Sequence, residues 1–256
     1  MSTTDKPILV LKIGGNQVED ETFLAGFVAA VKGLLAEHAV VIVHGGGKEI
    51  SDLHSRLDVG FETVEGLRAT SPESMRLVEM VLNGTVNTRL VRWLVNAGVD
   101  ALGLSGVDLG LVHTTPLTVR GKSLGLVGQV ATVNGEALLQ LLDLDLTPVI
   151  SPVSLGADGL AYNVNADHVA AGVAKAVEAS KLVFVSNVPG VQVAGRTVAA
   201  LSLTQIEELI AEGHITGGMI PKVRSATDAV ERGVYQAVIT DLDGLAAGKG
   251  TAIVSG

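Results

Sequence analysis

The sequence predicts an α/β fold built on an open, mainly parallel sheet. Residues 40–43, Val-Val-Ile-Val, are β-branched and apolar, which is typical of a strand buried on both faces. Gly45 to Gly47 follow closely, and a helical pattern begins at Lys48. The chain opens with the same kind of unit, in which an apolar strand at 8–12 leads through Gly14-Gly15 to a helix. Two such units favour parallel strands with both glycine turns at their carboxyl edge, where open α/β sheets bind ligands.

The composition limits the kinds of protein that the chain can be. Its 256 residues suffice for one large domain or two closely joined lobes with a sizeable core. A hydrophobic content of 47% with only 3% aromatic residues means that aliphatic side chains build that core. The net charge of −9 argues against a nucleic-acid partner. The absence of cysteine excludes disulfides, thiolate metal sites and cysteine nucleophiles.

The sequence also predicts where the protein resides. Residues 1–7 contain no apolar segment of the kind found in signal peptides. The apolar runs are all far shorter than the ~20 residues that a membrane-spanning helix needs. We therefore expect a cytoplasmic protein with no membrane partner.

The first half of the chain continues with helices and short strands. Residues 20–36 carry apolar side chains at helical spacing, and residues 61–67 alternate weakly between polar and apolar. Pro72 suits the first position of a long helical region that runs to about residue 99. Short alternating runs between residues 101 and 133, including 109–112, predict hairpins.

The second half alternates helices and strands without a linker-like stretch, so any two lobes would share an interface. Ser202 and Gln205 have the spacing of a capping box. The predicted elements are a helix at 134–143, a strand at 147–153, a turn at 156–159, an Ala-rich helix after Asn163–Asp167 that runs to about 179, a strand at 181–186, a helix to 211, a last helix from about 217 to 232, and strands near 235–240 and 250–255.

Several signatures of nucleotide and metal sites are incomplete. Gly121-Lys122-Ser123 resembles the end of a Walker A loop, but Pro116 stands where the first glycine is required. No Gly-x-Gly-x-x-Gly occurs, so a Rossmann fingerprint is absent. Asp241 to Gly244 lacks the further ligands of a calcium loop. We expect no protein metal site, and the histidines without ligand spacing are interpreted as surface or satisfied residues: His44, His54, His113, His168 and His214.

The remaining features are suited to handling phosphate. Lys12 ends a strand just before a glycine pair, and Lys222 lies in the first turn of a helix behind Gly217-Gly218. Asp167 also begins a helix and could hold both ammonium groups. Phosphoryl transfer needs cations and backbone donors around the moving group. Each residue has an alternative interpretation, Lys12 as a solvated strand end and Asp167 as an acid favoured by the helix dipole.

Six motifs together resemble the acetylglutamate kinases of the amino acid kinase family. The resemblance extends from about residue 8 to the last strand, and the order and spacing of the motifs are more specific than any one of them. The motifs are Lys12-Ile13-Gly14-Gly15, His44-Gly45-Gly46-Gly47, Gly66-Leu67-Arg68, Gly103-Leu104-Ser105-Gly106-Val107-Asp108, Asn163-Val164-Asn165-Ala166-Asp167 and Gly217-Gly218-Met219-Ile220-Pro221-Lys222.

The resemblance implies a three-layer αβα sandwich of the carbamate kinase-like kind, in one amino acid kinase domain. An N-terminal lobe of about residues 1–160 would bind the acyl amino acid and mediate dimerisation. A C-terminal lobe of about 161–256 would bind ATP. The implied reaction is ATP-dependent phosphorylation of the side-chain carboxylate of N-acetyl-L-glutamate, giving N-acetyl-L-glutamyl 5-phosphate in arginine biosynthesis. Mg²⁺ would bridge the ATP phosphates, and the carboxylate nucleophile needs no general base.

The resemblance also implies roles for individual residues. Lys12 and Lys222 would stabilise the transferring phosphoryl group, and Asp167 would orient them. Gly15 and Gly46 would donate N–H groups to the γ-phosphate. The acceptor would be held by Gly45, Gly46, Arg68, Asn163 and Asn165. ATP would contact Lys12, Asn187, Val188, Pro189, Gly190, Val191, Gln192, Gly217, Gly218, Met219 and Lys222.

Two alternatives stay open at this point. Asn187 stands where the family often has Asp, and Ser186 to Gly190 resembles a related kinase of carrier-bound aminoadipate in lysine biosynthesis. That relative usually departs from the motifs at Asn163–Asp167 and at Gly218–Lys222, which are intact here. A non-catalytic nucleotide or amino-acid sensor is the second alternative. Because only seven residues precede the first strand, the resemblance implies a homodimer that arginine does not inhibit.

Overall fold

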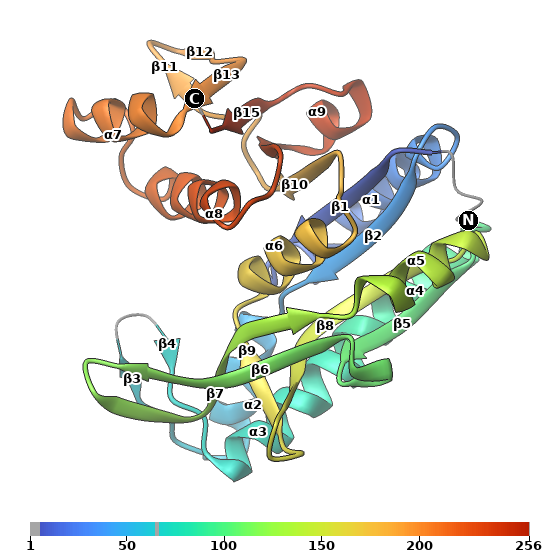
Figure 1. Cartoon of the computed structure of the whole chain (residues 1–256), viewed down its shortest axis with the longest axis vertical. Coiled ribbons are helices and arrows are strands. Elements are labelled where there is room, and N and C mark those ends of the chain that lie inside the picture. The colour runs from blue at the N-terminus through green and yellow to red at the C-terminus, as the bar shows by residue number, and fades with distance from the viewer. Residues whose placement is uncertain (1–5, 65–66, 256) are drawn as a thin grey trace.

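A sheet of eleven strands runs through the computed structural model, which describes residues 6–64 and 67–255 (Figure 1). Gly66 and residues 1–5 of the N-terminal stretch lie outside the described residues. The strands are β1 (Ile8–Ile13), β2 (Ala39–His44), β5 (Ala101–Gly106), β6 (Val112–Val119), β7 (Lys122–Val133), β8 (Thr147–Gly156), β9 (Ala161–Val164), β10 (Lys181–Val185), β13 (Ala200–Ser202), β14 (Ala237–Thr240) and β15 (Thr251–Val254).

The sheet is mainly parallel, as the sequence predicts. The order is β13-β15-β14-β10-β1-β2-β8-β6-β7-β9, and β5 pairs with β8. Parallel pairing joins β14, β10, β1, β2 and β8 through its centre. Antiparallel pairing occurs at the β14–β15, β6–β7 and β8–β9 contacts. Two small hairpins stand apart from the sheet, β3 (Thr63–Val64) with β4 (Leu67–Arg68) and β11 (Gln192–Val193) with β12 (Arg196–Thr197).

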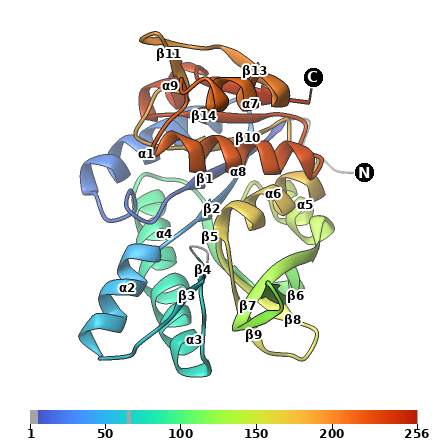
Figure 2. The same ribbon diagram turned by 90° about the vertical axis from the view of Figure 1, so that its left-hand side faces the viewer.

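Helices cover both faces of the sheet, which confirms the three-layer αβα sandwich (Figures 1 and 2). The α-helices are α1 (Glu21–Leu34), α2 (Gly47–Arg56), α3 (Pro72–Glu79), α4 (Asn87–Asn96), α5 (Gly135–Asp143), α6 (Ala166–Ala176), α7 (Leu203–Ala211), α8 (Met219–Glu231) and α9 (Leu242–Ala247). None of these described helices is long and apolar enough to cross a membrane.

The alternation of side chains along β1 assigns the two faces. Leu9, Leu11 and Ile13 are buried in the core that α1, α3 and α4 form on one side. Val10 is buried in the other core, against α5, α6 and α8. Because side chains two residues apart share a face of a strand, Lys12 lies on the same side as Val10. This parity directs Lys12 toward α6 and α8.

The long helical region predicted for 72–99 is divided in the structure. Ser71 caps α3 and Pro72 occupies its first turn, as predicted. A π-helix, Met80–Val86, then separates α3 from α4. Asn83 and Gly84 within this segment are weak helix formers, and Asn83 accepts a hydrogen bond from the Ser151 hydroxyl on β8. The chain therefore changes from α-helix to π-helix where it contacts the sheet. The spacing of apolar residues does not predict this change.

Three further expectations need correction or addition. The hairpin β6–β7 forms as expected, but β5 is a parallel strand of the main sheet. The run 109–112 begins in a 3₁₀ turn at Asp108–Gly110, where Leu109 has a φ of 55°. The helix predicted as the last is followed by α9, a six-residue helix whose N-cap is Asp241. The Asp241 carboxylate thus accepts the Gly244 N–H within a helix cap.

Candidate active site

The glycine turns after β1 and β2 meet at the carboxyl edge of the sheet. Ile13 is in register with His44 on β2 and with Val185 on β10, so the three strands end at the same level. A Cβ atom added at Gly15 would lie 2.8 Å from the Gly47 nitrogen and 2.9 Å from the Gly46 Cα. The backbones approach so closely that a side chain at position 15 has no room.

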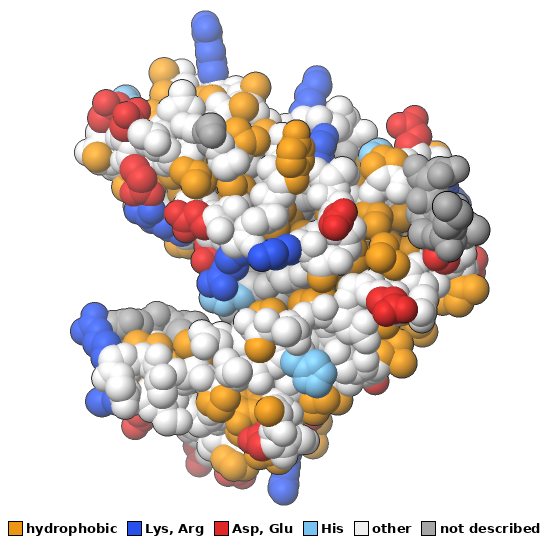
Figure 3. All heavy atoms as spheres, viewed as in Figure 1, with side chains coloured by type: hydrophobic (Ala, Val, Ile, Leu, Met, Phe, Trp, Pro, Cys, Tyr) orange, Lys and Arg blue, Asp and Glu red, His pale blue; other side chains and the backbone are white. Residues whose placement is uncertain are grey.

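Two cavities open on either side of this junction. The first, of about 500 Å³, lies beside α6, α8 and the end of β10, and Lys12 and Gly14 line it. The second, of about 310 Å³, lies over α2 and β9, and Gly15 lines it. Figure 3 shows the molecule deeply indented between its C-terminal elements and the part that carries β6 and β7. A group held at Lys12–Gly15 therefore stands between two separate binding spaces.

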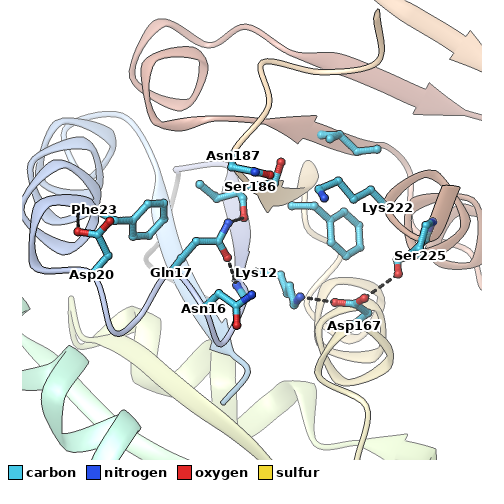
Figure 4. A pocket seen from close by; sticks show the side chains of 15 residues that line it. Lys12, Asn16, Gln17, Asp20, Phe23, Asp167, Ser186, Asn187, Lys222 and Ser225 are labelled. Atoms are coloured by element: carbon cyan, nitrogen blue, oxygen red, sulfur yellow. Dashed lines mark hydrogen bonds and ion pairs between the residues drawn. The ribbon is translucent and has the colours of Figure 1, made fainter. Parts of the chain in front are cut away.

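Lys12 and Asp167 form an ion pair that faces the first cavity (Figure 4). The Lys12 Nζ lies 2.7 Å from the Asp167 Oδ1, and the Ser225 hydroxyl donates to the Asp167 Oδ2 at 2.6 Å. Burial alone would raise the pKa of Asp167, but the Lys12 ammonium and the Ser225 hydrogen bond hold that pKa below its usual range. Asp167 is therefore ionised at neutral pH and fixes the position of the Lys12 ammonium.

Lys222 lines the same cavity but has a different partner. Its ammonium donates to the Gly218 carbonyl at 3.3 Å. The sequence predicts that Asp167 holds both lysines, whereas in the structure Asp167 is bonded to Lys12 and Ser225. Ser225 lies three residues after Lys222 and thus shares its face of α8. The Lys222 side chain is half-buried and lines the cavity. In Figure 4 it lies above Asp167.

The two glycine turns leave particular N–H groups free. The Gly14 N–H donates to the Gln17 Oε1 at 2.8 Å, and the Gly45 N–H donates to the Ile13 carbonyl at 3.0 Å. The resemblance assigns Gly45 to holding the acceptor, but in the structure its N–H is already used by the Ile13 carbonyl and is not free for a carboxylate. For Gly15 and Gly46, no acceptor within the described ranges takes the N–H group. These two are the donors that the resemblance assigns to the γ-phosphate.

His44 fixes the orientation of the second glycine turn. Its Nδ1–H donates to the Gly45 carbonyl at 3.1 Å, and its Nε2 accepts from the Asn87 amide at 3.1 Å. In a trans peptide the carbonyl and the following N–H point in opposite directions. Because the Gly45 carbonyl turns toward buried His44, the Gly46 N–H turns away from it, on the side where Gly46 lines the second cavity.

Residues of the π-helix and of the start of α4 contact His44 and the second glycine turn. The Asn87 amide also donates to the carbonyls of Leu104 at 3.3 Å and Val149 at 2.8 Å. A Cβ added at Gly46 would lie 2.6 Å from a methyl group of Leu82 in the π-helix. His54, the other fully buried histidine among the described residues, is likewise satisfied by Ile50 and Ser74, in agreement with the sequence interpretation.

We expect His44 to make folding stability depend on pH. Burial lowers the pKa of His44 from 6.5 to about 4. Between these values the unfolded chain binds more protons, so the contribution is fully present above pH 6.5 and is lost as pH falls toward 4. A shift of this size corresponds to about 3 kcal/mol of unfolding free energy.

Urea unfolding of the wild type and His44→Gln between pH 4 and 7 measures this effect, with exposed His113→Gln as the control. The His44→Gln variant should lose the part of the slope that His44 contributes, whereas His113→Gln should keep it; burial also lowers the pKa of His168, which therefore contributes to the remaining slope in both variants. If His44→Gln does not fold, the ring of His44 can be titrated by nitrogen NMR in the wild type. A ring that titrates near pH 6.5 would contradict the prediction.

Arg68 reaches the second cavity with an unused nitrogen. Its Nη2 donates to the Ser51 hydroxyl and to the Gly47 carbonyl, and its guanidinium lies 4.1 Å from the centre of the Phe61 ring. Its Nη1 is buried and has no hydrogen-bond partner among the described residues. An unpaired guanidinium nitrogen at a cavity wall is suited to a carboxylate ligand.

The asparagines before α6 have unequal roles. Both Asn163 and Asn165 line the second cavity. Asn163 donates to the Thr70 hydroxyl at 3.3 Å, a long contact that a ligand could replace. Asn165 is the N-cap of α6, and its Oδ1 accepts the Asp167 N–H at 2.8 Å. Asn165 therefore positions Asp167 as well as bordering the cavity.

The segment expected to contact ATP is only partly at the first cavity. Asn187 and Lys222 line it, together with Pro221. Val191 is instead buried in the core, and its N–H donates to the Thr251 hydroxyl at 2.8 Å. Gly217 and Gly218 are exposed just before α8. The cavity also has polar lining residues that the sequence reasoning missed: Asn16, Gln17, Asp20, Ser186 and Ser225.

Ion pairs fasten α2 to its surroundings. Arg89 on α4 binds both oxygens of Glu49, at 2.7 and 2.9 Å, and donates to the Val18 carbonyl at 3.1 Å. Lys48 pairs with Glu19 from the segment before α1. Together they hold the glycine turn that opens α2. No group of three or more His, Asp or Glu side chains that could bind a metal occurs in the described part of the chain.

The fold and the relatives of this chain define a class of protein, the phosphotransferases that act on a carboxyl group. The chain belongs to the amino acid kinase family, whose model matches residues 7–241.

Relatives and solved structures agree with this assignment. An acetylglutamate kinase of Chloroflexus aurantiacus is 54% identical over 93% of both chains, and one of Roseiflexus sp. is 49% identical over 98% of this chain and 95% of that one. The structure of smu.665 from Streptococcus mutans has a TM-score of 0.81 and 32% identity over 97% of this chain and 99% of that one. A carbamate kinase of Giardia lamblia bound to AMP-PNP shares the fold, with a TM-score of 0.70 and 17% identity over the whole of both chains.

Proposed function

We propose that this chain transfers the γ-phosphoryl group of ATP to the side-chain carboxylate of N-acetyl-L-glutamate. The observation that carries the proposal is the placement of Lys12 and Gly15 between two cavities. ATP would occupy the first cavity, beside Asn187 and Lys222, and the acceptor the second, beside Arg68 and Asn163. The names of the relatives at 49–54% identity support the acceptor.

The proposed chemistry needs little covalent help from the protein. A carboxylate oxygen of the acceptor attacks the γ-phosphorus, the bond to the bridging oxygen breaks, and ADP leaves as an acyl phosphate forms. Carboxylates titrate near ~4, so the nucleophile is already ionised at neutral pH. Lys12, Lys222 and the free N–H groups of Gly15 and Gly46 stabilise the charge on the transferring oxygens.

Mg²⁺ fits this arrangement as an ion carried by the nucleotide. The described residues contain no cluster that would bind it without ATP. The amide of Asn16 lines the first cavity and would offer an oxygen atom to an ion bound with the nucleotide, whereas the Asp20 carboxylate caps α1. When bound, the ion would neutralise the phosphate charge.

The cellular setting is part of the proposal. A biosynthetic kinase of this kind would act in the cytoplasm, in arginine biosynthesis, without nucleic-acid or membrane partners. A homodimer would form partly through residues 72–98. Met80 and Val95 in this region are 61% and 52% exposed, which supports an apolar contact between copies.

The Arg68→Ala variant should raise the KM for N-acetyl-L-glutamate by about 10- to 100-fold, because a hydrogen bond to a charged group is lost. The KM for ATP should stay unchanged, since Arg68 lines only the second cavity. Steady-state kinetics with each substrate varied in turn measure both constants. Exposed Arg196→Ala, on β12, is the matched control. An unchanged KM for the acceptor would contradict this role of Arg68.

An acyl-phosphate assay tests the function itself. The protein is mixed with ATP, magnesium and hydroxylamine, and N-acetyl-L-glutamate, L-glutamate and an N-acylated aminoadipate are compared as acceptors. Hydroxamate formed strongly with N-acetyl-L-glutamate alone supports the proposal. Preference for the aminoadipate compound would move the chain to the lysine pathway. Binding of ATP without any hydroxamate would identify a sensor.

A further inference from the structure

We propose that Ser225 is a positioning residue for phosphoryl transfer, which holds the Asp167 carboxylate so that Lys12 and the helix bearing Lys222 keep a fixed spacing. The observation is the hydrogen bond of 2.6 Å from the Ser225 hydroxyl to the Asp167 Oδ2. This inference rests on the function proposed above. From the sequence, Lys222 on α8 is expected to contact Asp167 on α6. In the structure Ser225 on α8 makes that contact.

The two oxygens of Asp167 have separate partners on separate elements. The Oδ1 faces the Lys12 ammonium from β1 at 2.7 Å, and the Oδ2 accepts from Ser225 on α8. The Asp167 side chain is only 19% exposed, so water has little access to replace either partner. A carboxylate held at both oxygens has one orientation, and Lys12 is held with it.

Ser225 also determines what Lys222 can do. Lys222 and Ser225 are three residues apart on α8 and line the first cavity together. The Lys222 ammonium is bonded to the Gly218 carbonyl, so it is not tied to Asp167. Because Ser225 fastens α8 to Asp167, Lys222 remains free to turn from Gly218 to a phosphate while its helix stays in place.

The Ser225→Ala variant should lower kcat by about 10-fold, with the KM for ATP nearly unchanged, because a hydrogen bond to an ionised group that fixes geometry is lost. Ser225→Thr keeps a hydroxyl at the same position and should recover most of the activity. Ser202→Ala, which removes a serine cap from α7 outside the site, is the control and should turn over normally. Thermal unfolding verifies that each variant is folded.

A second readout does not depend on the acceptor. Carbon NMR of aspartate carboxyl groups follows the titration of Asp167, and Asp167→Asn identifies its signal. Lys12, His168 and Ser225 surround this carboxylate and each lowers its pKa, while burial raises it. In Ser225→Ala the pKa of Asp167 should therefore rise.

The outcomes distinguish this inference from the proposed function. A tenfold lower kcat, recovery by Thr and a raised pKa of Asp167 would together establish the positioning role. A Ser225→Ala variant with normal kcat and an unmoved Asp167 signal would overturn it. A Ser225→Thr variant that does not restore a folded enzyme would also overturn it. So would a Ser225→Ala variant that loses kcat and ATP affinity equally. A wild type inactive toward every acceptor would instead refute the proposed function.

Discussion

The Lys222→Ala variant should turn over about 100- to 1,000-fold more slowly than the wild type, while its Kd for ATP changes only a few-fold. Lys222 lines the first cavity, and its ammonium is bonded only to the Gly218 carbonyl in the described structure. A cation that pairs with the phosphate charge as it develops stabilises the transition state more than the bound nucleotide. The loss should therefore appear in kcat.

Single-turnover kinetics and calorimetric titration with ATP separate the two effects. Lys32→Ala is the matched control, because Lys32 is an exposed lysine on α1 that donates to the Ala97 carbonyl away from both cavities. Lys222→Arg is informative as well, since arginine keeps the charge but is larger. An equal loss of ATP affinity and turnover in Lys222→Ala would show that Lys222 binds the nucleotide in the ground state.

The centre of the fold could be predicted because its strands are buried on both faces. β1 and β2 are apolar apart from Lys12 and His44 near their ends, and glycines follow both strands, so local sequence and global fold agree there. Gly103 and Ser105 interrupt the apolar pattern of β5, so the pattern does not predict a sheet strand there. Gly103 is needed where a Cβ would lie 2.2 Å from the Asn87 Oδ1, a contact between distant residues.

The sequence predicts those site residues whose positions depend on where a strand ends or a helix begins. Lys12 and Asp167 meet because Lys12 lies next to the end of β1 and Asp167 lies in the first turn of α6 at the same edge of the sheet. The role of Ser225 depends on which rotamers Lys222 and Asp167 adopt, and no motif encodes that choice. Its spacing of three residues from Lys222 was the available signal. The use of the Gly45 N–H by Ile13 depends on strand register, which the sequence leaves undetermined.

The Gly15→Ala variant should be nearly inactive and less stable by about 1–3 kcal/mol, as overpacked variants are. Its Cβ would meet the Gly47 nitrogen at 2.8 Å and the Gly46 Cα at 2.9 Å, and both are backbone atoms that cannot rotate away. The two glycine turns would have to separate. Because Gly15 and Gly46 carry the free N–H donors, separation should lower kcat by at least about 100-fold.

The control for this variant is Gly33→Ala. Gly33 lies in the last turns of α1, where an added Cβ meets nothing within 4 Å, so this substitution should leave kcat unchanged and slightly stabilise the helix. Steady-state kinetics and urea unfolding of both variants make the comparison. If Gly15→Ala retained normal turnover, the turns would tolerate separation, and the close approach of the two backbones would be a packing feature without a part in catalysis. If it lost stability alone, the N–H groups of Gly15 and Gly46 would not be the donors to the transferring phosphoryl group.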